Sequence, residues 1–245
     1  MIEATNILEQ YLESNSIFAE GYLAEDIKNK NWSALFYIIY AIKNFSNNVR
    51  LKEKIRLLAQ KRGVEDNNND VRRNYENQLV EFHALYVLTE KMKYNFIDFD
   101  ISSVKQCAKI GSNCDILVEK DEKYYFVEAK QSSTELMLKS FNSEYNLIDI
   151  NKPVWPDELG KYIKRLVKEG EDKGCDFLVL QVPKWGLPNL SIDALSNFLK
   201  QVSADITYMN GNWYWPIKDT HITKLIFLKE LVYWEIGIPE TQCLS

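Results

Sequence analysis

Apolar residues recur at intervals of three and four positions through the first quarter of the chain, which is the spacing of one face of a helix. This spacing predicts four helices, within residues 2–13, 18–28, 32–45 and 49–62. A polar stretch rich in Asn and Asp, residues 63–71, then interrupts the pattern and predicts a loop. We therefore expect a helical N-terminal region, residues 1–65, followed by a main domain, residues 66–245.

The main domain combines helical and strand patterns. Amphipathic runs predict helices over residues 71–92 and 156–170. Short runs of alternating or continuous apolar residues predict strands, at 95–101, 114–119, 124–129 and 175–182. The last of these runs stops at Pro183 and is apolar throughout, as in a strand that is buried on both faces. This order predicts a mixed α/β fold in which helices flank a central sheet.

The end of the chain carries the strongest local hairpin signal. The pair Asn210-Gly211 favours a two-residue turn, and aromatic residues flank it on both sides. We therefore expect a C-terminal aromatic hairpin within residues 206–215. A helical pattern over residues 191–202 precedes it.

Composition and charge argue against several classes of protein. The 245 residues are 46% hydrophobic and carry a formal net charge of -5, so the chain lacks the overall basic character of many nucleic-acid binders. The longest apolar run, residues 32–42, is too short to span a bilayer. The first residues mix acids into apolar positions, unlike a secretory signal. We expect a protein without a membrane partner that is located in the cytoplasm.

The predicted strands at 114–119 and 124–129 are separated by a short charged turn, so we expect them to form an apolar hairpin. Three charged residues lie in or directly after these strands: Asp115, Glu128 and Lys130. If Asp121 and Glu122 form the turn, Asp115 lies opposite Glu128, and Lys130 shares the face of Glu128. Two partly buried carboxylates would then repel each other, and burial would cost several kcal/mol per ion in order of magnitude. A bound proton, the lysine or a divalent cation could offset this. Mg²⁺ favours carboxylate and carbonyl oxygens, so a metal site explains the pattern.

Asp115, followed after twelve residues by Glu128-Ala129-Lys130, resembles the motif of the PD-(D/E)XK nuclease superfamily. Cys114 stands where this motif often has its proline. The resemblance implies the restriction-endonuclease-like fold and a metal-dependent endonuclease that hydrolyses phosphodiester bonds of nucleic acid, with DNA preferred over RNA. It implies Mg²⁺ or Mn²⁺ as the cofactor. Restriction and phage defence are among the processes that use this fold.

The resemblance also implies roles for individual residues. Three groups would bind the metal: Asp115, Glu128 and the carbonyl of Ala129. Lys130 would orient or activate the attacking water. The superfamily often adds a glutamate from the preceding helix, and Glu81 matches it best because it shares a helical stripe with apolar residues. Gln131 extends the motif and is a further candidate for the site.

A basic segment, residues 50–73, carries eight Lys and Arg against four Asp and Glu, which leaves a local charge of +4. Such a segment could contact phosphates, or it could be a solvated helix face. The candidates for nucleic-acid contacts are Arg50, Lys54, Arg56, Lys61, Arg62, Arg72 and Arg73. If these charges only solvate a helix, the N-terminal helices would need another role, such as formation of a homodimer.

Two other functions fit the same pattern. One is a catalytically silent module on the nuclease fold that binds nucleic acid or protein. The other is an α/β interaction protein whose N-terminal helices mediate assembly. The acids and the lysine of the motif are all present, which favours the nuclease over the silent module. An interaction protein should not hold Asp115 and Glu128 in its interior.

Overall fold

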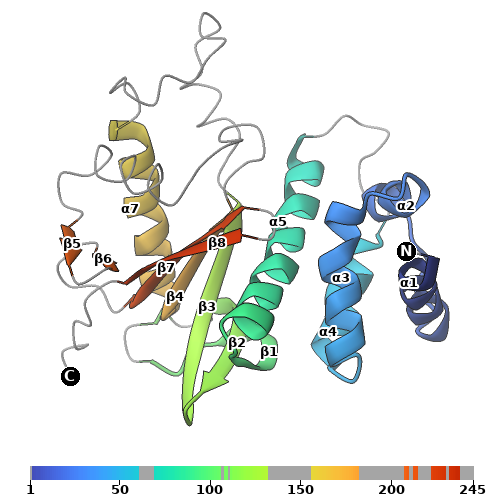
Figure 1. Ribbon diagram of the computed structural model, residues 1–245, viewed down its shortest axis with the longest axis horizontal. Coiled ribbons are helices and arrows are strands. Elements are labelled where there is room, and N and C mark those ends of the chain that lie inside the picture. Colours follow the sequence, from blue (N-terminus) through green and yellow to red (C-terminus); the bar gives the residue numbers. More distant parts are fainter. Residues whose placement is uncertain are drawn as a thin grey trace, which may run out of the picture. The chain divides into compact units, whose positions relative to one another are not determined.

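The computed structural model describes residues 2–60, 69–105, 108–109, 111–131, 156–181, 207–209, 212–214, 222–229 and 232–237 (Figure 1). The chain forms two compact units. The first unit consists of Met1–Asp100 and Ile116–Tyr124, and the second consists of Ile101–Asp115 and Tyr125–Ser245. The domain boundary expected near residue 65 lies outside the described residues and stays a prediction.

The helices expected in the N-terminal region are present. They are α1 (Ile2–Ser14), α2 (Gly21–Lys28), α3 (Trp32–Phe45) and α4 (Val49–Leu58). The long helix that follows them is α5 (Asn69–Tyr86), which continues into a short π-helical turn, η1 (Val87–Lys91). Within the first unit, α3 packs against α1 and α5.

The apolar stripes of these helices form one core. Its fully buried side chains include Leu8, Leu23, Leu35, Ile38, Leu51, Ile55, Phe82, Leu85 and Leu88. Each of these side chains contributes about 1.5–3 kcal/mol to folding through the apolar surface that it removes from water. Glu81 lies on the same inward face of α5, because only 8% of this residue is exposed. Its expected inward orientation is therefore confirmed.

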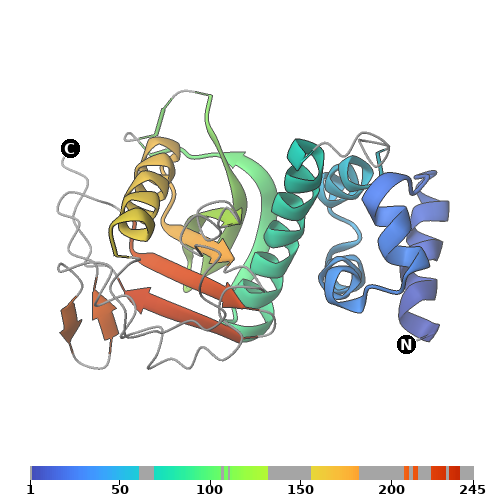
Figure 2. The ribbon, with the colours of Figure 1, turned by 90° about the horizontal axis from the view of Figure 1, so that it is seen from above.

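Six strands form the central sheet, in the order β1-β2-β3-β4-β7-β8. They are β1 (Asn95–Ser102), β2 (Asn113–Lys120), β3 (Lys123–Gln131), β4 (Phe177–Gln181), β7 (Lys224–Lys229) and β8 (Val232–Gly237). Strand β4 pairs in parallel with β3 and β7, and β8 is antiparallel to β7 (Figure 2). Helix α7 (Pro156–Lys173) lies between β3 and β4 in the sequence and packs against β4. The predicted mixed α/β fold is confirmed.

Two strands of the sheet, β7 and β8, were not predicted. The residues between them, Glu230-Leu231, offer none of the Gly, Pro, Asn or Asp signals that mark a turn. The aromatic hairpin was predicted, and its strands β5 (Thr207–Met209) and β6 (Asn212–Tyr214) do pair antiparallel. The helix expected over residues 191–202 lies outside the described residues. In the part of the chain that the structure describes, no helix has the length and apolar character needed to cross a membrane.

The end of α7 is fixed by Gly174. This residue has φ +71°, its N–H donates to the carbonyl of Glu171 at 2.9 Å, and the N–H of Cys175 donates to the carbonyl of Gly170 at 2.9 Å. These two bonds form a Schellman motif, which ends the helix at Lys173 and turns the chain toward β4. A Cβ atom at Gly174 would lie 2.6 Å from Ser103 Oγ. Glycine is therefore required here both for its backbone conformation and for its size.

We expect the substitution Gly174→Ala to destabilise the protein by more than about 2 kcal/mol. The left-handed backbone costs a non-glycine residue about 1–2 kcal/mol, and the steric overlap with Ser103 adds about 1–3 kcal/mol. Gly111 is the matched control, because it has φ +81° but a Cβ atom added there would have no neighbour within 4 Å. Gly111→Ala should cost only about 1–2 kcal/mol. Chemical denaturation measures both, and equal losses would contradict this account of Gly174.

Candidate metal site

The hairpin of β2 and β3 has the two-residue turn that the sequence predicts. Asp121 has φ +52° and Glu122 has φ +62°, as the two central residues of a type I′ turn require. A two-residue turn at this position places Asp115 across from Glu128. The Asp115 carboxylate accepts a hydrogen bond from the backbone N–H of Ala129 through Oδ2, at 2.7 Å. The hairpin therefore brings Asp115 next to the motif on β3.

Glu128 is the most deeply buried charged residue of this site, with 0% of its side chain exposed. One carboxylate oxygen, Oε1, lies 2.6 Å from Lys130 Nζ and 2.5 Å from Lys173 Nζ. The other oxygen, Oε2, is also buried and has no hydrogen-bond partner among the described residues. A buried carboxylate oxygen without a partner loses its hydration and gains nothing in exchange. Such an oxygen is a ready ligand for a cation.

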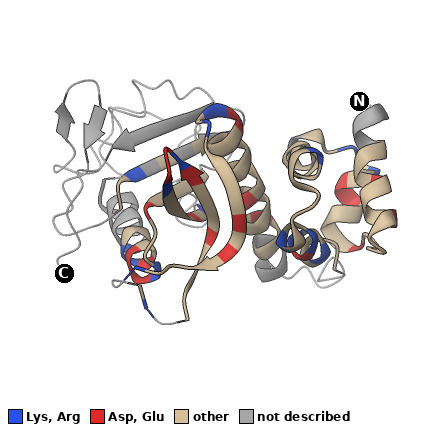
Figure 3. Cartoon of the chain, turned by 90° about the horizontal axis from the view of Figure 1, so that it is seen from below, with Lys and Arg blue, Asp and Glu red and all other residues tan. Residues whose placement is uncertain are grey.

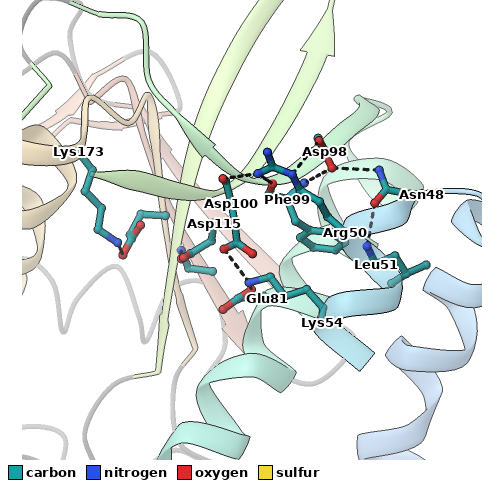
Figure 4. A network of polar contacts seen from close by, with 12 residues as sticks. Asn48, Arg50, Leu51, Lys54, Glu81, Asp98, Phe99, Asp100, Asp115 and Lys173 are labelled. Carbon is teal, nitrogen blue, oxygen red and sulfur yellow. Dashed lines mark hydrogen bonds and ion pairs between the residues drawn. The ribbon is translucent and has the colours of Figure 1, made fainter. Parts of the chain in front are cut away.

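Sequence reasoning missed Lys173. This residue ends α7 (Figure 4) and, along the chain, it is 45 positions away from Glu128. The sequence shows only that Lys173 is a basic residue in the last turn of a helix. Such a residue interacts favourably with the helix dipole in any protein, so this position does not indicate a site. Nothing in the local pattern connects it to Glu128. The contact follows from the end of α7 at Gly174 and from the parallel pairing of β3 with β4.

Burial and neighbouring charges shift the pKa values of two groups in the site. Burial raises the pKa of Asp115 to about 6, and the negative charge of Glu128 adds to this, while Lys173, Lys130 and the Ala129 N–H act in the opposite direction. Burial alone would lower the pKa of Lys130, but Glu128 and Asp115 raise it above its ordinary value. Lys130 therefore carries its proton at neutral pH. In this state it donates hydrogen bonds and cannot accept a proton.

The donors of this site fit a hard divalent cation. Asp115 and Glu128 supply carboxylate oxygens, which Mg²⁺ and Mn²⁺ prefer. The partnerless Oε2 of Glu128 is the specific observation that supports a cation there. The two ammonium groups already balance the two carboxylates in charge, but both of them contact the same oxygen, Oε1. A cation would therefore enter a site in which two lysines already balance the charge of the two carboxylates.

A second group of charges lies in the first unit, around Lys54 of α4. Lys54 forms an ion pair with Glu81 of α5 and another with Asp100 of β1, the latter at 3.0 Å (Figure 4). Only 6% of Lys54 and 8% of Glu81 are exposed. Burial alone would lower the pKa of Lys54, but the two acids raise it. Glu81 is thus paired with Lys54, which the sequence instead suggested as a candidate for nucleic-acid contacts.

The same face of α4 also binds β1 through Arg50. Its Nη1 donates to the carbonyl of Phe99 at 2.7 Å and also to the carbonyl of Asp100, and its Nε lies 3.4 Å from Asp98. Asn48 caps α4 by accepting from the N–H of Leu51 and donates to Asp98 as well (Figure 4). Arg50 and Lys54 lie one helical turn apart and together attach α4 to β1.

These contacts correct part of the expectation for the basic segment. Lys54 was a candidate for nucleic-acid contacts, but it is buried and its ammonium pairs with two acids, Glu81 and Asp100. Arg56 pairs with Glu53 of the same helix at 2.5 Å, although Lys and Arg outnumber Asp and Glu on α4 (Figure 3). Lys61 and Arg62 lie outside the described residues. The side chains of the remaining candidates are not described, namely Arg72 and Arg73 in α5 and Gln131 in β3.

No protein-family model, curated protein or solved structure matches this chain. The resemblance to the PD-(D/E)XK nucleases therefore rests on the motif residues alone. Four residues of the second unit form the candidate metal site: Asp115, Glu128, Lys130 and Lys173. Ala129 contributes its N–H as a donor to Asp115.

The raised pKa of Asp115 predicts a pH-dependent stability. The folded protein binds this proton more tightly than the unfolded chain does, so the contribution favours folding at low pH and is lost as the pH rises from about 4 through 6. Asp115→Asn removes the charge and keeps an oxygen that can accept from Ala129. We expect this variant, without metal, to be more stable than wild type by about 1–3 kcal/mol at pH 8. The difference should disappear near pH 4.

Urea denaturation at the two pH values measures this difference. Asp121→Asn is the control, because Asp121 lies in the exposed turn of the same hairpin. A variant Asp115→Asn that is less stable than wild type at pH 8 would contradict the account of Asp115 as a destabilising buried charge.

The burial of Lys54 predicts a large loss of stability when its charge is removed. Lys54→Met removes the ammonium group that pairs with Glu81 and Asp100, and removal of one partner from a buried ion pair such as Lys54–Glu81 costs about 3–5 kcal/mol. Lys52→Met, on a more exposed position of the same helix, should change stability by no more than about 0.5 kcal/mol. Urea denaturation measures both. Similar effects of the two substitutions would show that Lys54 is a surface residue.

Proposed function

We propose that this protein is a metal-dependent endonuclease that hydrolyses phosphodiester bonds of nucleic acid. DNA is the substrate that the resemblance favours, and Mg²⁺ or Mn²⁺ is the cofactor. The observation that carries this proposal is the buried Glu128 carboxylate, whose Oε2 has no partner among the described residues while Oε1 contacts two lysines. Its position beside Asp115 in the hairpin supports it further.

The residues of the site have distinct tasks in this proposal. Asp115 and Glu128 would hold the cation through their carboxylates, with Ala129 as the third ligand that the motif implies. When bound, a divalent cation polarises a phosphoryl oxygen and favours the ionised form of water. Lys130 acts as a hydrogen-bond donor because its raised pKa keeps it protonated. It can therefore orient the attacking water or stabilise negative charge that develops on the phosphate.

Glu81 remains a proposed metal ligand, but its support differs from that of Asp115 and Glu128. It belongs to the first unit, where Lys54 pairs with it. The proposal for Asp115, Glu128 and Lys130 does not depend on Glu81. The catalytically silent module stays the alternative function, and a cleavage assay separates the two.

We expect Glu128→Gln and Lys130→Met each to reduce Mg²⁺- or Mn²⁺-dependent cleavage of DNA by about 10²–10⁴-fold. Glu128→Gln removes the negative charge that a cation needs, and Lys130→Met removes the donor but keeps the length of the side chain. The assay should compare duplex DNA, single-stranded DNA and RNA, with a chelator as the metal-free reference. Circular dichroism should show that each variant keeps the fold.

The exposed turn of the hairpin provides a matched control. It contains another acid followed after one residue by lysine, Asp121-Glu122-Lys123, and all three residues are exposed. The double variant Asp121→Asn, Lys123→Met should cleave as wild type does. Cleavage by Glu128→Gln at the wild-type rate would refute the proposed active site. A wild-type protein that binds nucleic acid but never cleaves it would favour the silent module.

A further inference from the structure

Lys173 is a charged residue of the site that the nuclease motif does not account for. Its Nζ and that of Lys130 both lie within 2.6 Å of the same oxygen, Glu128 Oε1. Two ammonium groups so close together repel each other, and the negative charges of Glu128 and Asp115 oppose this repulsion, with a smaller contribution from Glu169 at Lys130. The site therefore has the charge balance of a completed ion-pair network before any cation is added.

We propose that Lys173 is the resident counter-ion of the metal-free site and that its ammonium leaves Glu128 when a divalent cation binds. This inference rests on the proposed function, because it concerns the same carboxylates. Addition of a divalent cation to two carboxylates and two ammonium groups would leave an excess of positive charge in a partly buried place. Departure of one ammonium group reduces that excess.

The fold makes Lys173 the lysine that can leave. Lys130 lies within β3, where it is paired in register with Leu180 of β4, and it follows Glu128 by two residues on the same face. Lys173 is the last residue of α7 (Figure 4). The two lysine side chains are exposed to a similar extent, 27% for Lys173 and 31% for Lys130, so exposure does not distinguish them. Their positions do, because Lys173 lies at a helix end, whereas Lys130 lies within a strand and is also attracted by Glu169. The Schellman motif at Gly174 fixes the backbone of this helix end. Rotation of the side chain is therefore sufficient to move the Lys173 ammonium into water.

The first test measures Mn²⁺ affinity by isothermal titration calorimetry at constant pH. Lys173→Met removes the competing charge, so it should bind Mn²⁺ at least about tenfold more tightly than wild type. Lys173→Arg keeps the charge and should bind Mn²⁺ with an affinity near that of wild type. Lys168→Met is the control on the same helix, because Lys168 is exposed, and it should leave the affinity unchanged. Glu128→Gln should abolish the binding.

The second test uses the wild-type protein and does not depend on the folding of a variant. An amine-acylating reagent labels lysines according to their accessibility, and mass spectrometry locates the labels. Labelling of Lys173 should rise severalfold when Mn²⁺ is added, because the amine then leaves its ion pair for water. Labelling of Lys168 should stay constant.

The outcomes separate this inference from the proposed function. Mn²⁺ binding that needs Glu128, with unchanged or weaker affinity in Lys173→Met or unchanged labelling of Lys173, would overturn the role of Lys173 alone. Absence of Mn²⁺ binding by wild type, or binding that persists in Glu128→Gln, would overturn both. Tighter binding by Lys173→Met together with increased labelling of Lys173 would establish the exchange.

Discussion

The structure of the second unit depends on how it accommodates one buried carboxylate, that of Glu128. A fully buried ion is stable only when opposite charges and hydrogen bonds replace its hydration. Here two lysines, Lys130 and Lys173, meet one oxygen of the carboxylate, while the other oxygen has no partner among the described residues. This asymmetry distinguishes the site from a typical buried ion pair that serves only the structure. In such a pair, both carboxylate oxygens would have hydrogen-bond partners.

Several local features hold the groups around Glu128 in place. The type I′ turn sets the register of the hairpin and so places Asp115 beside the motif. The glycine at the end of α7 sets where the helix stops and so places Lys173. Asp176, just before β4, accepts from the N–H of Phe126 at 2.8 Å and joins the start of β4 to β3. The first two are backbone features and the third is a side-chain contact between neighbouring strands, so the positions of these groups are set by the secondary structure.

The parts of the fold and site that could be predicted are those encoded locally. Helices α1 to α5 follow from apolar stripes, and the closeness of Asp115 to Glu128 follows from one hairpin whose turn lies between them. Lys173 and Lys54 could not be placed, because their acidic partners lie 45 and 27 residues away. A lysine on an amphipathic helix is typical of a solvated face. In this protein, two such lysines instead neutralise acids that the sequence analysis had assigned to the metal.

The central claim is that Asp115 and Glu128 together bind a divalent cation, and a crystal grown with Mn²⁺ tests it most directly. The anomalous scattering of manganese identifies the ion without reference to activity. The account predicts an anomalous peak in contact with Oε2 of Glu128 and with a carboxylate oxygen of Asp115. Absence of an anomalous peak at Glu128, with Mn²⁺ bound at full occupancy elsewhere on the protein or with Glu128 still paired to both lysines, would contradict it.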